Sequence, residues 1–228
     1  MNDINLFLYE EIMLLALRDE EGTIAASFVE QVIAGAVLAE LLLGGRISVG
    51  GSKKQLVDIH DATHAGDPIV DECLDKISAS KKPASLQAWV TQLAGLKDLR
   101  HRVAQQLCER GILRADQDKV LFLFKRRIYP EINSVPEKAI IERLRAAIFS
   151  DTAELDPRTV VLISLADGSD LLNQTFGRKE LKGRQERIKQ IANGELTGKA
   201  TKDVITACQT AVMVAAIMPA IVSTTVVS

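Results

Sequence analysis

The chain has few cysteines, few aromatic residues and almost no net charge. Its three cysteines, Cys73, Cys108 and Cys208, are far apart in a sequence of 228 residues. An odd and scattered set excludes a disulfide framework or a cysteine-rich zinc module, and it suits a reducing compartment. Lysine and arginine total 28 against 30 aspartates and glutamates, which leaves a net charge of −2. We therefore expect no nucleic-acid partner, and any anion binding has to come from a local basic patch.

The beginning of the chain also lacks the pattern of a secretory leader. Met1-Asn2-Asp3-Ile4-Asn5 places no basic segment before an apolar core, so we expect no signal peptide. Hydrophobic residues make up 47% of the sequence and charged residues 25%, which is the ordinary mixture of a globular protein and excludes disorder as the main state. Since no repeat or linker-like stretch divides the sequence, we expect one domain over residues 1–228.

Aliphatic residues repeat at intervals of three and four along most of the chain, which is typical of amphipathic helices. A helix over residues 27–43 would be apolar on most sides, as expected in the middle of a bundle. We therefore expect an all-α domain, mainly helical with two small β-hairpins around a central helical bundle. The predicted helices cover residues 6–18, 27–43, 69–78, 86–93, 97–110, 136–149, 157–172, 178–191 and 204–221, and the predicted strands cover 46–49, 55–59 and 120–124.

Motifs for catalysis or metal binding are missing or incomplete. His60-Asp61-Ala62-Thr63-His64 resembles the H-E-x-x-H zinc pattern, but the following Ala65-Gly66-Asp67-Pro68 predicts a loop, so the two imidazoles would not share a helix face. The stretch from Gly44 to Lys53 is rich in glycine, yet Gly51 stands where a phosphate-binding loop has its lysine. No G-x-S-x-G motif occurs. We expect no enzyme, no catalytic residue, no metal site and no cofactor.

The predicted helix over residues 97–110 carries a basic cluster. Lys97, Arg100 and His101 are spaced by three and four, so they can share one helix face. A cluster of this kind can hold a phosphate or sulfate group. The alternative is a solvated charged face opposite the apolar seam of the same helix.

A second basic stretch directly follows an apolar run. Val120-Leu121-Phe122-Leu123-Phe124 precedes Lys125-Arg126-Arg127. An apolar tip flanked by lysine and arginine can lie in an anionic membrane interface. The run can also be an edge strand that pairs with another subunit, or a strand that packs on the protein's own core. The residues alone leave these three readings open.

Four segments, taken in their order and spacing, resemble the Golgi phosphoprotein 3 family. They are Leu6 to Gly22, Leu38 to Ile47, Gly66 to Leu74, and Arg100 to Leu113. The resemblance covers nearly the whole chain and implies a mostly helical domain that binds membranes peripherally through phosphatidylinositol 4-phosphate. Eukaryotic members act at the Golgi, where they bind glycosyltransferase tails and vesicle coat. The compact form of this chain is similar to the bacterial branch, so we do not transfer a Golgi location to it.

The same resemblance implies where a headgroup pocket would lie. The family uses one tryptophan, one arginine from the second helix and two basic residues from the later basic helix. In this chain the first two positions fall near Ala25 and Ala34, while Lys97 and Arg100 keep the two basic positions. We therefore expect weak selectivity for one phosphoinositide. The family's hairpin, linked to membrane insertion and self-association, matches Val120 to Tyr129.

Together these residues predict a non-enzymatic, adaptor-like protein in the cytoplasm, peripherally associated with a membrane. Lys97 and Arg100 would supply the anion site, and the hairpin with its three basic residues would supply apolar and electrostatic contact. The expected partner is an anionic phospholipid surface, with a second copy of the chain and membrane-protein tails as further candidates. One alternative is a soluble oligomeric scaffold that uses residues 120–129 as a subunit interface. The other is an enzyme of unrecognised type, indicated only by charged residues such as Asp167 and Asp170.

Overall fold

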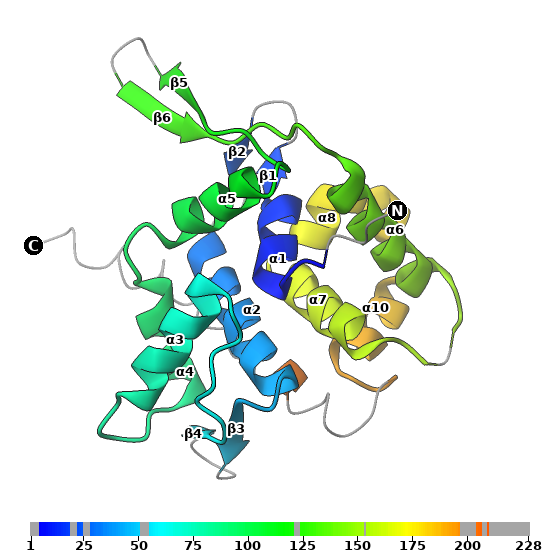
Figure 1. Ribbon diagram of the computed structural model, residues 1–228. Coiled ribbons are helices and arrows are strands. Elements are labelled where there is room, and N and C mark those ends of the chain that lie inside the picture. Colours follow the sequence, from blue (N-terminus) through cyan, green and yellow to red (C-terminus); the bar gives the residue numbers. More distant parts are fainter. Residues whose placement is uncertain are drawn as a thin grey trace, which may run out of the picture.

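The computed structural model describes residues 5–18, 22–24, 28–50, 55–120, 124–152, 154–196, 204–206 and 209. At its centre lie helices α1 (Leu8–Ala16) and α2 (Val29–Leu43), which pack against each other and against α7 (Pro157–Gly168) (Figure 1). All of α1 is buried, and α2 is buried continuously over residues 32–39. Because both helices are apolar on nearly every side, they can be surrounded completely by other helices. The prediction of a mainly helical protein is confirmed.

The remaining helices surround this centre on two sides (Figure 1). On one side α3, α4 and α5 pack on α1 and α2, and on the other side α6, α8 and α10 pack on α1 and α7. These outer helices are amphipathic, so each buries one apolar face and leaves the opposite face to solvent. Their bounds are α3 (Pro68–Ser78), α4 (Leu86–Ala94), α5 (Leu99–Glu109), α6 (Val135–Phe149), α8 (Leu171–Phe176), α9 (Arg178–Leu181) and α10 (Gln185–Ala192).

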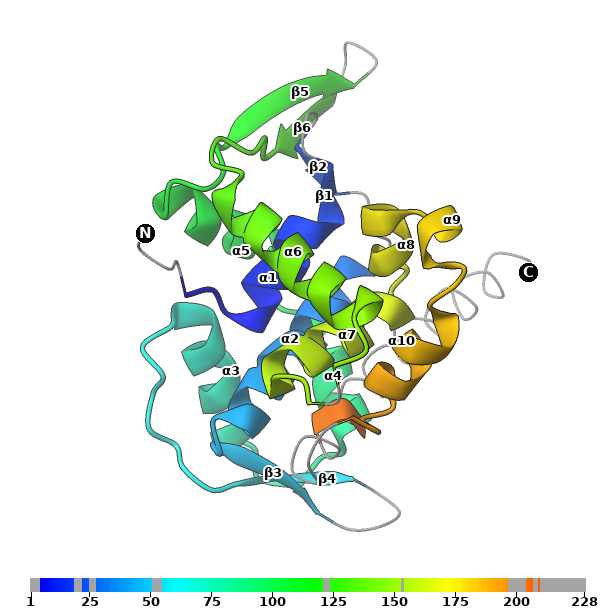
Figure 2. The ribbon, with the colours of Figure 1, turned by 90° about the vertical axis from the view of Figure 1, so that its right-hand side faces the viewer.

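The described strands form three antiparallel pairs at two ends of the molecule. The pair β3 (Ile47–Gly50) and β4 (Leu56–Ile59) lies at one end, and β5 (Asp116–Val120) with β6 (Phe124–Ile128) projects at the other (Figure 2). Beside β6 lies a third pair, β1 (Leu17–Arg18) and β2 (Thr23–Ile24). Only two hairpins were predicted. The helix predicted over residues 6–18 ends at Ala16, because the next two residues pair with β2.

The strand predicted over Val120–Phe124 is wrong. Val120 ends β5 and Phe124 begins β6, and the two residues stand opposite each other in the pair. The prediction followed the apolar run, whereas the real strands lie on either side of it and are largely polar. An exposed hairpin needs no apolar face, so polar residues can form its ladder through backbone hydrogen bonds alone. Residues 121–123 lie outside the described residues, as do the side chains of Val120, Phe124 and Lys125.

Two long helices predicted near the end of the chain are divided. The one predicted over residues 157–172 becomes α7 and α8, because Asp170 adopts a left-handed conformation at φ +64° between them. The one predicted over 178–191 becomes α9 and α10. A single left-handed residue ends a helix because its carbonyl and amide no longer follow the helical direction. Of the helix predicted over 204–221, only residues 204–206 and 209 are among those described.

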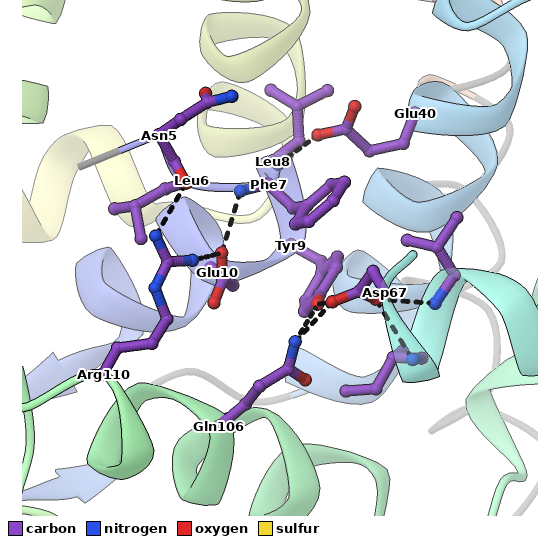
Figure 3. Close-up of polar contacts among 12 residues, drawn as sticks. Asn5, Leu6, Phe7, Leu8, Tyr9, Glu10, Glu40, Asp67, Gln106 and Arg110 are labelled. Carbon is purple, nitrogen blue, oxygen red and sulfur yellow. Dashed lines mark hydrogen bonds and ion pairs between the residues drawn. The ribbon is translucent and has the colours of Figure 1, made fainter. Parts of the chain in front are cut away.

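Buried polar contacts tie the first turn of α1 to α5 and α3 (Figure 3). The Glu10 carboxylate accepts from the Phe7 amide at 2.9 Å and from Arg110 at 2.5 Å. The Tyr9 hydroxyl donates to Asp67 at 2.7 Å and accepts from Gln106 at 2.9 Å. Burial raises the pKa of Tyr9, so the hydroxyl keeps its proton and remains a donor. These contacts satisfy polar groups that are cut off from water.

Asp67 and Glu40 extend this network to further helices. Asp67 caps α3 by accepting from the Ile69 and Val70 amides at 3.1 and 2.8 Å. Glu40 of α2 accepts from the Leu8 amide at 2.5 Å and forms a two-point ion pair with Arg158 of α7, each contact being 2.8 Å. The start of α1 is thereby held by side chains from α2, α5 and α7 and by Asp67, which caps α3. These contacts fix the positions of the helices relative to one another.

Candidate functional site

A basic cavity lies between the start of α5, strand β6 and strand β2. These three elements are neighbours in the ribbon of Figure 1. Its volume is about 360 Å³. Three arginines come together in its wall, Arg100 from α5 and Arg126 and Arg127 from β6. The other lining residues are Thr23, Ile24 and His101. Among the residues that line it in the described parts of the chain, none is an aspartate or a glutamate.

The walls meet because the backbone at Gly22 approaches β6 very closely. The Tyr129 amide donates to the Gly22 carbonyl at 2.7 Å. Gly22 is left-handed at φ +60°, and a Cβ atom placed there would lie 2.2 Å from the Pro130 nitrogen. Only glycine fits both the backbone conformation and the contact. This approach holds β2 beside β6, so Thr23 and Ile24 become part of the cavity.

Arg100 and Arg127 form ion pairs at the rim of the cavity. Arg100 Nη1 lies 3.2 Å from Glu30 Oε1, and Arg127 Nη1 lies 3.9 Å from Asp98 Oδ1. All four side chains are between 29% and 56% exposed, and such solvated pairs contribute at most about 1 kcal/mol. A guanidinium has five N–H donors, so one carboxylate at one nitrogen leaves most of them for another anion. The cavity can therefore accept a phosphate or sulfate group.

His101 stands in the wall between the arginines. Its Nδ1 atom lies 3.0 Å from the Tyr129 hydroxyl. Burial lowers the pKa of His101, and the positive charges of Arg127 and Arg100 lower it further. The ring is therefore neutral at pH 7, and an anion that offsets the two arginines would favour its charged form.

The structure places the predicted site residues in different surroundings. Arg100 lines the basic cavity. Lys97 is exposed in the turn between α4 and α5, because α5 begins only at Leu99, and it is not among the residues that line the cavity. Ala34 is 1% exposed within α2, so it presents nothing to a ligand. Ala25 lies outside the described residues.

Arg126 and Arg127 belong to the same cavity as Arg100, although the sequence grouped them with the apolar run of the hairpin. Sequence reasoning also missed Thr23 and Ile24. No local signal marked these two residues, since a pair of two-residue strands has no spacing that points to an anion site. The glycine after an acidic turn, Gly22, was the one visible sign that the chain reverses there.

The loop containing His60 and His64 is confirmed as non-helical. His64 Nε2 lies 2.9 Å from Asp75 Oδ1, and the negative charges of Asp75 and Asp71 raise the pKa of this exposed imidazole. In the part of the chain that the structure describes, no group of three or more histidine, cysteine, aspartate or glutamate side chains could hold a metal ion. Over the same residues, no helix has both the length and the apolar character needed to cross a bilayer.

Comparisons with known proteins agree with this fold and its pattern of residues. Residues 8–208 match the family model of Golgi phosphoprotein 3, GPP34. A similar curated protein is vacuolar protein sorting-associated protein 74 of Eremothecium gossypii, which is 26% identical over 215 residues. That match covers 78% of this chain and 64% of the relative, so the chain spans somewhat less than two thirds of the relative's length. Since the family model covers most of the sequence, the chain belongs to the Golgi phosphoprotein 3 family.

Proposed function

We propose that this protein is a peripheral membrane protein of the adaptor type that binds the phosphorylated headgroup of an anionic phospholipid in the basic cavity. The observation that carries the proposal is the convergence of Arg100, Arg126 and Arg127 from two elements on one cavity of about 360 Å³. Phosphatidylinositol 4-phosphate is the headgroup that the family resemblance implies. No catalytic step is part of this function.

The chemistry of the lining suits a phosphate group. Arginine presents a planar fork of donors that matches two phosphate oxygens, and such charge-assisted bonds are the stronger kind. Because the whole chain carries a net charge of only −2, the attraction is local and depends on these few side chains. Each basic residue near an anionic surface contributes about 1 kcal/mol. Little else in the lining could distinguish one inositol ring from another, so weak selectivity among phosphoinositides is part of the proposal.

Co-sedimentation with vesicles tests the proposal. Phosphatidylcholine vesicles would carry either phosphatidylinositol 4-phosphate or phosphatidylserine at equal total charge. Arg100→Ala and Arg126→Ala should each weaken binding about fivefold, the loss expected for one basic contact. Lys97→Ala should have a smaller effect, because Lys97 does not line the cavity. Arg178→Ala, which removes an exposed arginine of α9, is the charge-matched control and should bind as the parent protein does.

Two results would refute the headgroup site. One is binding by Arg100→Ala and Arg126→Ala that equals binding by the Arg178→Ala control. The other is no retention of the parent protein by anionic vesicles even at low salt, where electrostatic attraction is strongest. A salt series also measures how much of the binding is electrostatic, because the attraction of these exposed arginines to an anionic surface weakens as the ionic strength rises.

An oligomeric scaffold is the second candidate function, and the projecting β5–β6 hairpin favours it (Figure 2). A hairpin that stands away from the helical body can pair with another subunit. Lys119 and Lys125 are partners in the strand register, so replacing Val120–Phe124 by Asn-Gly joins them through a two-residue turn and keeps the register. If the hairpin tip is a subunit interface, light scattering should show a fall in mass for this variant. An unchanged mass would contradict the scaffold.

A further inference from the structure

A second cavity shares His101 and Arg127 with the basic cavity but has a different chemistry. Its volume is about 480 Å³, and it lies between α5, the beginning of β5 and β6. Besides the two shared residues, its charged lining consists of Asp98, Arg102 and Asp116. We call it the mixed cavity, because carboxylates and guanidinium groups both face it.

Asp98, Arg127 and Asp116 of the mixed cavity have only long ion pairs, whereas Arg102 has a close partner, Glu72, that does not line the cavity. Asp98 lies 3.9 Å from Arg127, and Asp116 lies 3.6 Å from Arg114, with every one of these side chains between 44% and 63% exposed. Arg102 forms an ion pair with Glu72 through Nη2, which leaves its other N–H groups. Exposed pairs at such distances hold weakly, so a ligand can exchange with them.

The balance of charge excludes the simplest ligands. A plain anion would meet the two carboxylates, and a plain cation would meet the two guanidinium groups, so each would gain attraction on one side and lose it on the other. A group that carries both charges a short distance apart avoids this conflict. The Tyr129 hydroxyl, which lies 3.0 Å from His101 Nδ1, adds a neutral polar group to the lining.

We propose that the mixed cavity binds an amino-phosphate group, that is, a primary ammonium joined by a short linker to a phosphate, as in ethanolamine phosphate. The phosphate lies against Arg127, Arg102 and the Tyr129 hydroxyl, and the ammonium lies against Asp98 and Asp116. A primary ammonium donates three hydrogen bonds to carboxylates. A trimethylammonium donates none, so the cavity prefers the ethanolamine type to the choline type.

Both cavities have α5 and β6 as walls. The two cavities are therefore adjacent, and His101 and Arg127 line both of them. The lipid form of the ligand, phosphatidylethanolamine, rests on the proposed function, whereas free ethanolamine phosphate does not. The two sources present the same chemistry and are separated by experiment.

Isothermal titration calorimetry on the intact protein tests the binding of free ethanolamine phosphate. Ethanolamine phosphate should bind about fivefold or more tightly than choline phosphate or inorganic phosphate, because only it forms the carboxylate contacts. Asp116→Asn should weaken its binding by a similar factor while keeping the local structure, since an asparagine oxygen can still accept from the Gln117 amide as Asp116 does at 2.7 Å. Glu186→Gln, an exposed carboxylate of α10, is the matched control and should change nothing.

Co-sedimentation with vesicles tests the binding of the lipid form, phosphatidylethanolamine. Replacing part of the phosphatidylcholine by phosphatidylethanolamine, at constant phosphatidylinositol 4-phosphate, should increase retention of the parent protein but not of Asp116→Asn. Arg126→Ala, which lies only in the basic cavity, should weaken phosphoinositide binding about fivefold and leave the binding of ethanolamine phosphate unchanged, so failure of one site is distinguishable from failure of the other. Equal binding of the ethanolamine and choline compounds, or no saturable binding of ethanolamine phosphate, would overturn the proposal.

Discussion

His101 is the residue at which the two cavities meet. It lines both, and its pKa is lowered by burial and by the charges of Arg127 and Arg100. Asp98 and Glu30 act in the opposite sense but more weakly. An anion in the basic cavity offsets the two arginines and raises the pKa of the ring, so the bound protein takes up a proton that the free protein does not hold.

Headgroup binding should therefore strengthen as the pH falls from the pKa of His101 in the bound protein towards its lowered pKa in the free protein. Vesicles of phosphatidylglycerol are suited to this measurement, because their phosphodiester does not titrate in that range. His101→Gln should flatten the pH dependence of vesicle binding, whereas His64→Gln, in the loop before α3 and outside the lining of both cavities, should keep it. The prediction is contradicted if the parent protein and His101→Gln show the same slope between about pH 7.5 and 5.5.

Glu10 shows what burial does to a single charge. Its side chain is 0% exposed, burial raises its pKa, and Arg110 at 2.5 Å opposes that shift. Arg110→Ala leaves the carboxylate buried without its partner, which should lower the free energy of unfolding by about 3–5 kcal/mol. Urea denaturation measures the loss.

The loss in free energy of unfolding caused by Arg110→Ala should also become smaller as the pH falls through the pKa of Glu10 in the folded protein. A group whose pKa is raised by folding stabilises the folded state in its protonated form, so acid removes the unpaired charge. The double variant Glu10→Gln, Arg110→Ala should recover part of the stability at neutral pH. A loss below about 1 kcal/mol at neutral pH for Arg110→Ala would show that the pair behaves as a solvated surface pair instead.

At the scale of elements, the turn between β1 and β2 supports the wall of the basic cavity. Gly22→Ala adds a Cβ where the Pro130 nitrogen and Tyr129 carbon would be 2.2 and 2.4 Å away. We expect a loss of about 2 kcal/mol or more in stability from the left-handed conformation and the clash together. Vesicle binding should weaken as well, because β2 has to move away from β6.

Gly45→Ala is the control for this substitution. Gly45 is equally left-handed at φ +65°, but an added Cβ meets no atom within 4 Å. It should cost only about 1 kcal/mol of backbone strain and leave vesicle binding unchanged. If Gly22→Ala binds vesicles as well as Gly45→Ala does, the contact between the turn and β6 does not shape the site.

Prediction of the elements succeeded where apolar residues repeat and failed where they do not. The spacing of buried leucines and valines located α2, α3 and α5 to within two residues. The strands β5 and β6 were misplaced because their sequence, with Asp116 to Lys119 before the apolar run, has no alternation that a pattern could detect. Likewise β1 and β2 are only two residues each, which is too short for any periodicity.

At the scale of the whole molecule, Glu40 and Arg158 join helices from distant parts of the chain. The carboxylate is 9% exposed, contacts Arg158 at two points and also accepts from the start of α1. Arg158→Ala should lower the free energy of unfolding by about 3–5 kcal/mol, because it leaves Glu40 buried and unpaired. Fluorescence and circular dichroism should show one common transition, since the network ties α1, α2 and α7 together.

Arg114→Ala is the comparison for this whole-molecule effect. Arg114 also forms an ion pair, but it lies 3.6 Å from Asp116 with both side chains at least half exposed. Its removal should change stability by no more than about 1 kcal/mol. Equal losses for Arg158→Ala and Arg114→Ala would mean that the link between α2 and α7 does not contribute more than an ordinary surface pair.

The sequence by itself determined the helical class, the buried character of α2 and the likeness to one family. These properties depend on local spacing, because each helix repeats its environment every few residues. Only the tertiary structure decided that Arg100 meets Arg126 and Arg127, that Lys97 stays apart, and that His101 separates two cavities of different charge. That convergence depends on the approach of the Gly22 backbone to Tyr129 and Pro130, a contact between distant segments that no local pattern of residues records.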